Sequence, residues 1–194
     1  MASKSEGIDH VLDVSERLFL ERGYAGTRLR DIAGGLGIHH ASLYYHAPGG
    51  KEELWRRVIE RALGRHHAGL TEAATRAGPD LRAQLVAMAL WLVSQPAMNV
   101  VALASSDLPA SPQPQARDTF EQIYANVMTP VRDVFQAAAD RGEIGDRPPD
   151  LLTGMFVSSM NALPTADHAG MLPIPTAILA EMVVDVILDG SRAT

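Results

Sequence analysis

The chain contains no cysteine among its 194 residues. This absence excludes disulfide bridges, thiolate zinc sites and a cysteine nucleophile, and it fits a reducing compartment. Aromatic residues make up only 5% of the chain, and runs of β-branched residues in strict alternation are missing. Because alanine, leucine, valine and methionine dominate the apolar residues, the composition favours helices over sheets. We therefore predict a nearly all-α protein.

The chain also lacks a long apolar run. The longest one, Leu85 to Val93, is far shorter than the roughly 20 residues that a membrane-spanning helix needs. The polar beginning, MASKSEG, does not have the pattern of a secretory signal. We therefore expect a cytoplasmic protein with no membrane partner.

Positive charge is scarce, since the formal net charge is −6, but the charges are unevenly distributed. Residues 1–66 hold ten Lys and Arg against nine Asp and Glu, a balance of +1, whereas the remainder holds seven against fourteen, a balance of −7. Five of the seven histidines also lie in the first part. A neutral to slightly basic head on an acidic body is compatible with DNA binding.

The most informative segment is TRLRDIAGGLGIHHASLYYHAPGGK, residues 27–51. It is typical of two short helices joined by a glycine turn and followed by the start of a third helix. Thr27 is expected to cap the first short helix with its hydroxyl, and Gly37 to end it in a left-handed conformation. The second short helix is predicted over residues 39–46, with Leu43 facing inward. This is the layout of a helix-turn-helix that reads DNA.

Helical periodicity continues through the rest of the chain. Gly23 is expected to stop the first helix, Pro130 to bend a long one, and Gly190 to stop the last one. About nine helices are predicted, over residues 4–22, 27–36, 39–46, 51 to about 68, 80–95, 97–106, 115 to about 141, 148–163 and 175–188. Residues 107–114 are predicted to form a loop. We predict a helix-turn-helix DNA-binding domain over 1–50, extended by the start of the connecting helix at 51–66. Residues 67–194 would form a larger helical domain for ligand binding and dimerisation.

Four stretches in about the first third of the chain carry a family resemblance: Ile8 to Asp13, LFLERGYAGTRLRDIA (18–33), GIHHASLYYH (37–46) and PGGKEEL (48–54). This resemblance is to the TetR-type transcriptional regulators. It implies a homodimer on a palindromic operator, usually a repressor, that is released when a small molecule fills a cavity in the body. One departure is Ala47, where the family usually has an aromatic residue that packs the end of the recognition helix.

In such a helix-turn-helix, residues near the start of the second helix read base edges, and flanking groups contact phosphates. As an alternative to DNA contacts, the two tyrosines of this helix would pack against the protein, and its histidines would lie on a solvent-exposed edge. The predicted DNA-binding residues are Thr27, Arg28, His39, His40, Ala41, Ser42, Tyr44, Tyr45, His46 and Lys51.

Methionine and aromatic residues of the body are candidates for an apolar effector pocket with a few polar groups. For each of them, core packing is the alternative. The predicted ligand-binding residues are Met88, Trp91, Met98, Asp107, Phe120, Tyr124, Met128, Met155, Phe156 and Asn161. The last two helices carry small residues beside apolar ones and are predicted to form the homodimer interface, with an internal hairpin as the alternative.

The parts of an enzyme are missing from the sequence. Gly50 and Lys51 do not complete a phosphate-binding loop, because Tyr45 stands where its first glycine belongs and Glu52 follows the lysine. His66 and His67 are adjacent, which is not a metal-ligand spacing, and no GxSxG motif occurs. We predict neither an enzyme nor a bound metal or cofactor. The competing hypothesis is a small-molecule-binding helical protein that no longer binds DNA.

Overall fold

A computed structural model describes residues 4–95, 121–168 and 174–191 of the chain. Within these ranges the chain forms eight α-helices and one π-helix and contains no strand, which confirms the predicted all-α class. The described residues up to Ala62 form one compact unit, unit 1, and those from Leu63 onward form unit 2. None of the described helices combines the length and the apolar character needed to cross a membrane. The predicted helix 97–106 and loop 107–114 lie outside the described residues.

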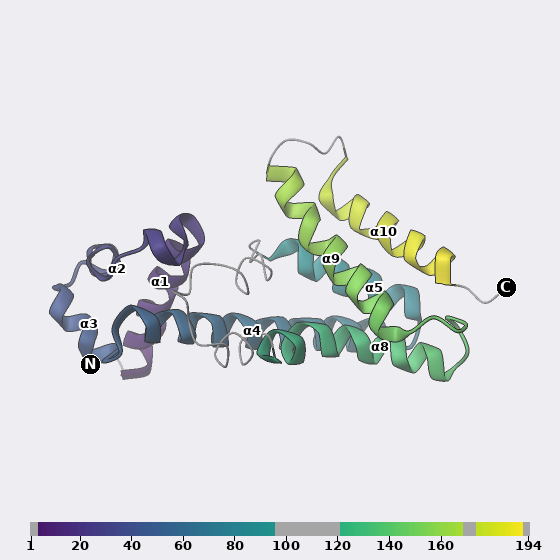
Figure 1. Ribbon diagram of the computed structural model, residues 1–194, viewed down its shortest axis with the longest axis horizontal. Helices are drawn as coiled ribbons and strands as arrows, with labels where there is room; N and C mark the ends of the chain where they lie inside the picture. Colours follow the sequence, from purple (N-terminus) through teal and green to yellow (C-terminus); the bar gives the residue numbers. More distant parts are fainter. Residues whose placement is uncertain (1–3, 96–120, 169–173, 192–194) are drawn as a thin grey trace. The chain divides into compact units, whose positions relative to one another are not determined.

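Unit 1 contains three helices and the beginning of a fourth (Figure 1): α1 (Lys4–Gly26), α2 (Leu29–Leu36), α3 (His40–His46) and the first part of α4 (Gly50–Ala77). The expected break at Gly23 is present, because this glycine interrupts α1 with a φ of 71°. The helices share one apolar core, whose buried members are Val11, Leu12, Val14, Leu18, Phe19, Ile32, Ala33, Leu43, Ala47, Leu54 and Val58.

Ion pairs add a second link between α1 and α4 inside this unit. Arg61 of α4 donates to Glu16 at 2.7 Å and pairs with Asp13 at 2.8 Å. The side chain of Glu16 is only 13% exposed, so this pair is less screened by water than an ordinary surface pair. The part of α4 that belongs to unit 1 therefore makes both apolar and polar contacts with α1.

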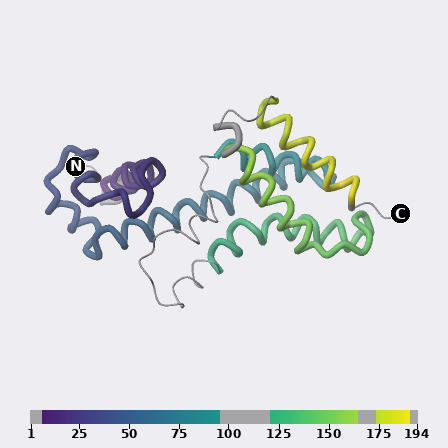
Figure 2. The backbone as a smooth tube through the Cα atoms, turned by 45° about the horizontal axis from the view of Figure 1, so that its top comes forward, coloured from purple at the N-terminus to yellow at the C-terminus, as the bar shows by residue number. Residues whose placement is uncertain are grey.

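Unit 2 contains the rest of α4 together with α5 (Leu81–Ser94), a π-helix η1 (Tyr124–Met128), α8 (Thr129–Asp140), α9 (Pro149–His168) and α10 (Thr176–Ser191). Helix α9 lies between α8 and α10 and contacts both (Figure 2), and α5 packs against all three. Phe135 and Phe156 are both fully buried in this bundle and form a T-shaped pair, with ring centroids 6.4 Å apart. The bundle thus has its own core.

Several helices are longer than predicted. Helix α4 continues to Ala77, where Gly78 with a φ of 80° ends it, rather than ending near residue 68. Helix α9 runs on through Pro164 to His168, and α10 passes Gly190 to Ser191. Helix α9 thus continues past a proline and α10 past a glycine, although both residue types often end helices in sequence patterns.

Pro130, which was expected to bend its helix, lies directly after a change in hydrogen-bond pattern. The turn before it widens into η1, and the backbone N–H of Thr129 donates to the carbonyl of Tyr124, five residues earlier. A π-turn shifts the hydrogen-bond register by one residue, which accommodates the N–H that proline lacks.

Candidate nucleic-acid interface

The turn between α2 and α3 has the predicted glycine exit. Gly37 adopts a left-handed conformation with a φ of 67°, and its N–H donates to the carbonyl of Gly34 at 3.2 Å. The N–H of Ile38 donates to the carbonyl of Ala33 at 3.1 Å. These two bonds close the end of α2 in a Schellman-type turn, so the direction in which α3 begins is determined by the backbone.

Helix α3 is anchored to unit 1 by its inner face. Leu43 is 1% exposed and belongs to the apolar core, as predicted. Ala47 directly follows α3, is equally buried, and donates its N–H to the carbonyl of Leu43 at 2.8 Å. The small side chain at the position of the family's usual aromatic residue is therefore enclosed by the core.

The outer face of α3 is exposed and rich in aromatic and hydrogen-bonding groups. His40, Ala41 and Ser42 are exposed, and the exposed fraction reaches 46% for Tyr44 and 70% for Tyr45. The rings of His40 and Tyr44 form a T-shaped pair with centroids 6.2 Å apart. The ring of Tyr45 and that of the half-buried His46 form a similar pair with centroids 5.3 Å apart. An exposed helix face of this kind can offer donors, acceptors and apolar edges to a partner.

His39 has a structural role as well as an exposed side chain. It precedes α3 as its N-cap, and its Nδ1 accepts a hydrogen bond from the N–H of Ala41 at 3.4 Å.

Thr27 corrects a prediction made from the sequence. Its side chain is completely buried, and its hydroxyl donates toward the carbonyls of Gly23 at 2.8 Å and Leu18 at 3.1 Å. The hydroxyl thus closes the end of α1 instead of capping α2, and it is not available to a phosphate. The N-cap of α2 is Arg28, whose N–H donates to the carboxylate of Asp31 at 2.9 Å.

Lys51 is half-buried, and its ammonium group is engaged inside unit 1. The Nζ donates to the carbonyls of Tyr24 at 2.9 Å and Thr27 at 3.1 Å, and it lies 4.0 Å from the centre of the Tyr24 ring. Burial, together with the negative charge of Glu52, raises the pKa of Tyr24 above its ordinary value, so the ring stays neutral under the cation. A phosphate contact by Lys51 would have to use its one remaining N–H donor.

Unit 1 carries exposed basic side chains that are not among the predicted residues. Arg28 is exposed as predicted, and so is Arg30, whose closest carboxylate oxygen, on Asp31, is 4.0 Å away. Arg17 and Arg22 on α1 are also exposed. Sequence reasoning gave no weight to Arg30, Arg17 or Arg22, although cations flanking a helix-turn-helix are the expected phosphate ligands.

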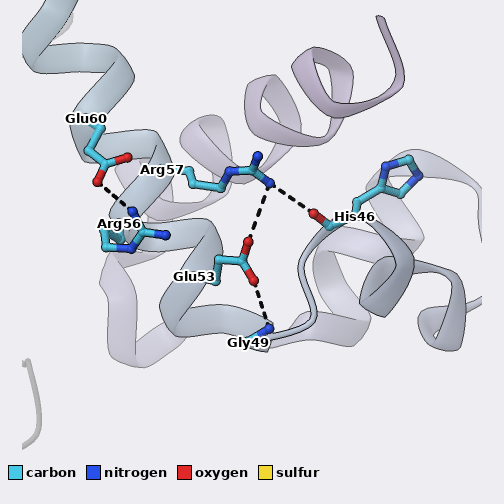
Figure 3. Close-up of polar contacts among 6 residues, drawn as sticks. All are labelled: His46, Gly49, Glu53, Arg56, Arg57 and Glu60. Atoms are coloured by element: carbon cyan, nitrogen blue, oxygen red, sulfur yellow. Dashed lines mark hydrogen bonds and ion pairs between the residues drawn. The ribbon is translucent and has the colours of Figure 1, made fainter. Parts of the chain in front are cut away.

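Sequence reasoning also missed two residues at the start of α4. Arg57 donates from Nη1 to the carbonyl of His46 at 3.0 Å, and Glu53 accepts from the N–H of Gly49 at 2.8 Å (Figure 3). The available signal was the spacing of these two residues, which are four apart on one helix directly after the predicted recognition helix.

The predicted ligand-binding residues differ in their exposure to solvent. Met88 and Phe156 are fully buried in the core of unit 2, and Trp91, Met128 and Asn161 are half-buried. Met155 is exposed on α9, and its assignment to the pocket stays a prediction. Tyr124 is also exposed and donates its hydroxyl to Asp150 at 3.0 Å. Met98, Asp107 and Phe120 lie outside the described residues.

Comparison with known proteins decides the family of unit 1. Residues 11–58 match the family model described as bacterial regulatory proteins, tetR family, and this stretch contains all of α2 and α3. Unit 1 belongs to the tetR family. Over 55 residues, 28% of this chain, the sequence is 46% identical to IcaR of Staphylococcus epidermidis, a negative transcriptional regulator of the biofilm operon icaADBC. The tetR-type match spans 29% of the length of IcaR.

Solved structures extend the likeness to the whole tetR-type fold. The fatty acid degradation regulator FadR from Bacillus halodurans superposes with a TM-score of 0.77 at 15% identity, covering 100% of this chain and 99% of that one. A putative tetR-family regulator from Mesorhizobium loti superposes with a TM-score of 0.70 at 19% identity and covers all of both chains. At these identities the likeness establishes the fold alone.

Proposed function

We propose that this chain is a DNA-binding transcriptional regulator that represses its target genes and responds to a small molecule. The observation that carries the proposal is the exposed face of α3, held on a buried leucine within a unit of the tetR family. The name of IcaR, a negative regulator, favours repression over activation. His39, His40, Ser42 and Tyr44 are the proposed base-reading residues, and Arg28 and Arg30 the proposed phosphate contacts.

The test is binding of the full chain to the duplex DNA that flanks its own gene. We expect His39→Ala and Tyr44→Ala each to weaken operator binding by about 1 to 3 kcal/mol, since each removes a base contact. His67→Ala is the matched control, because His67 is exposed on α4 but belongs to unit 2. Fluorescence anisotropy titrations measure all four proteins. Equal affinities would refute the assignment of α3, and a wild-type chain that binds no DNA would favour the small-molecule-binding alternative.

A homodimer is the second part of the proposal. Leu151, Met155, Ile178, Met182 and Val186 are apolar side chains of α9 and α10 that are about half exposed or more. The exposed Ser158 and Ala162 continue the spacing of the α9 residues along the same side of the helix. Two adjacent helices with such a stripe fit a four-helix interface with a second copy, related by a twofold axis. This arrangement would present two copies of α3 to the two halves of a palindromic operator.

The effector belongs to the third part of the proposal. We expect an apolar or amphipathic molecule bound in unit 2, where Met88 and Phe156 are buried and Trp91 and Met128 are half-buried. Release from DNA requires the molecule to bind the DNA-free conformation more tightly than the DNA-bound one. A long-chain fatty acid, with its apolar chain and polar head, is a suitable first probe in a thermal unfolding assay.

A further inference from the structure

The last residue of α3 has a partner outside its own helix. The final carbonyl groups of an α-helix do not accept a hydrogen bond from any N–H of that helix, and they form the negative end of the helix dipole. The carbonyl of His46 instead accepts a hydrogen bond from Nη1 of Arg57 on α4 at 3.0 Å. A guanidinium group at this position satisfies a free carbonyl and interacts favourably with the dipole.

Glu53 completes this connection from the same face of α4. One carboxylate oxygen accepts from the N–H of Gly49 at 2.8 Å, and the other lies 3.6 Å from Nη1 of Arg57 (Figure 3). The Glu53 and Arg57 side chains are only 23% and 36% exposed. Together they connect α4 to both the end of α3 and the loop that follows it.

The neighbouring arginine has no such connection. Arg56 is 59% exposed and donates to Glu60 at 2.6 Å, one turn further along the same helix (Figure 3). An exposed pair with this spacing contributes little to stability and does not connect α4 to another element. Arg56 and Arg57 therefore form a natural comparison of the same residue type in adjacent positions.

We propose that Arg57 and Glu53 are positioning residues that hold α3 at a defined angle to α4 and act on DNA only through α3. The proposal rests on the proposed function, because it assigns DNA reading to α3. A residue that positions a reading helix influences affinity without neutralising a phosphate. A residue that contacts a phosphate also contributes about one unit to the slope of log affinity against log salt.

The experiment compares Arg57→Gln, Arg57→Lys and Glu53→Gln with the matched control Arg56→Gln. DNA affinity of the full chain is measured at several salt concentrations. We expect Arg57→Gln to weaken operator binding about tenfold, since a charged hydrogen bond is lost. The salt slope should stay unchanged, Arg57→Lys should recover part of the affinity, and Arg56→Gln should stay within about twofold of wild type. Unchanged affinity of Arg57→Gln, or a salt slope lower by about one, would overturn the proposal.

Amide hydrogen exchange separates this proposal from the proposed function. Without DNA, the amides at the end of α3 should exchange faster in Arg57→Gln than in wild type, whereas the amides of α1 should keep their wild-type rates. In the Arg56→Gln control, the amides of both helices should exchange at wild-type rates. Equal exchange at the end of α3 in wild type and Arg57→Gln would also overturn the proposal. A wild-type chain that binds no DNA but shows the expected exchange pattern would contradict the DNA function and leave the role of Arg57 supported.

Discussion

At the scale of single residues, Gly69 is a position where the absence of a side chain is required. It lies on α4 in unit 2, and the indole of Trp91 on α5 occupies the space where a Cβ would project. The rings of Trp91 and His66 are nearly perpendicular, with centroids 5.2 Å apart. The half-buried Trp91 thus packs against α4, which gives this predicted ligand-binding residue a packing role as well.

We predict that Gly69→Ala destabilises the protein by about 1 to 3 kcal/mol, because the new methyl group displaces the indole. Gly64→Ala is the matched control on the same helix, where a Cβ meets no atom within 4 Å. There, replacing glycine inside a helix should stabilise the protein by up to about 1 kcal/mol. Urea unfolding followed by tryptophan fluorescence measures both. Equal effects of the two substitutions would contradict the packing argument.

The residues of the candidate site were only partly predictable from the sequence. The exposed His40, Tyr44 and Tyr45 and the buried Leu43 follow from helical spacing, because opposite faces of α3 meet core and solvent. The burial of Thr27 did not follow, since its partners are carbonyls of α1 and depend on how α1 ends at Gly23. The engagement of Lys51 likewise depends on a turn 24 residues or more away.

At the scale of elements, the start of α9 is connected to η1 and α8 by one carboxylate. Asp150 accepts from Arg132 at 2.8 Å and from Tyr124 at 3.0 Å. The hydrogen bond from Arg132, followed by that from Tyr124, holds the pKa of Asp150 below its ordinary value. A lowered carboxyl pKa means that the connection stabilises the folded state above the ordinary aspartate pKa of about 4. The stabilisation is lost as the pH falls through the lowered pKa.

We predict that Asp150→Asn reduces stability at neutral pH and that its difference from wild type disappears on acidification. Urea unfolding over a series of pH values from about 7 to about 3 measures this difference. Asp146→Asn, at an exposed aspartate before α9, is the control and should show a smaller dependence on pH. A difference between wild type and Asp150→Asn that grows toward low pH would show the assigned sign to be wrong.

Within the described residues the order of the helices was predictable, but several of their ends were not. Local signals placed α2, α3 and α5 to within a residue or two, because caps such as Asp80 on the N–H of Ala83 lie next to the helix that they begin. The end of α9 was missed because Pro164 normally ends a helix, whereas α9, which contacts α8, α5 and α10, continues to His168. Such packing depends on residues distant in sequence.

At the scale of the whole molecule, we predict that a single charge in the apolar stripe prevents dimer formation. Val186→Asp is the most direct change, because Val186 is 72% exposed on α10 and an aspartate would be buried without a partner between two copies. Leu20→Asp, at an exposed leucine of α1 in unit 1, is the control and should leave the dimer intact. Light scattering at micromolar concentration measures the mass. A monomeric wild type, or a dimeric Val186→Asp, would contradict the proposed interface.

The stripe on α9 and α10 has a consequence for gene control. If pairing of two copies is required to engage both halves of an operator, occupancy depends on the square of the chain's concentration when subunits are mostly separate. Modest changes in expression would then produce disproportionate changes in transcription. The strength of attraction between five apolar side chains would thus set the abundance at which the regulator begins to act.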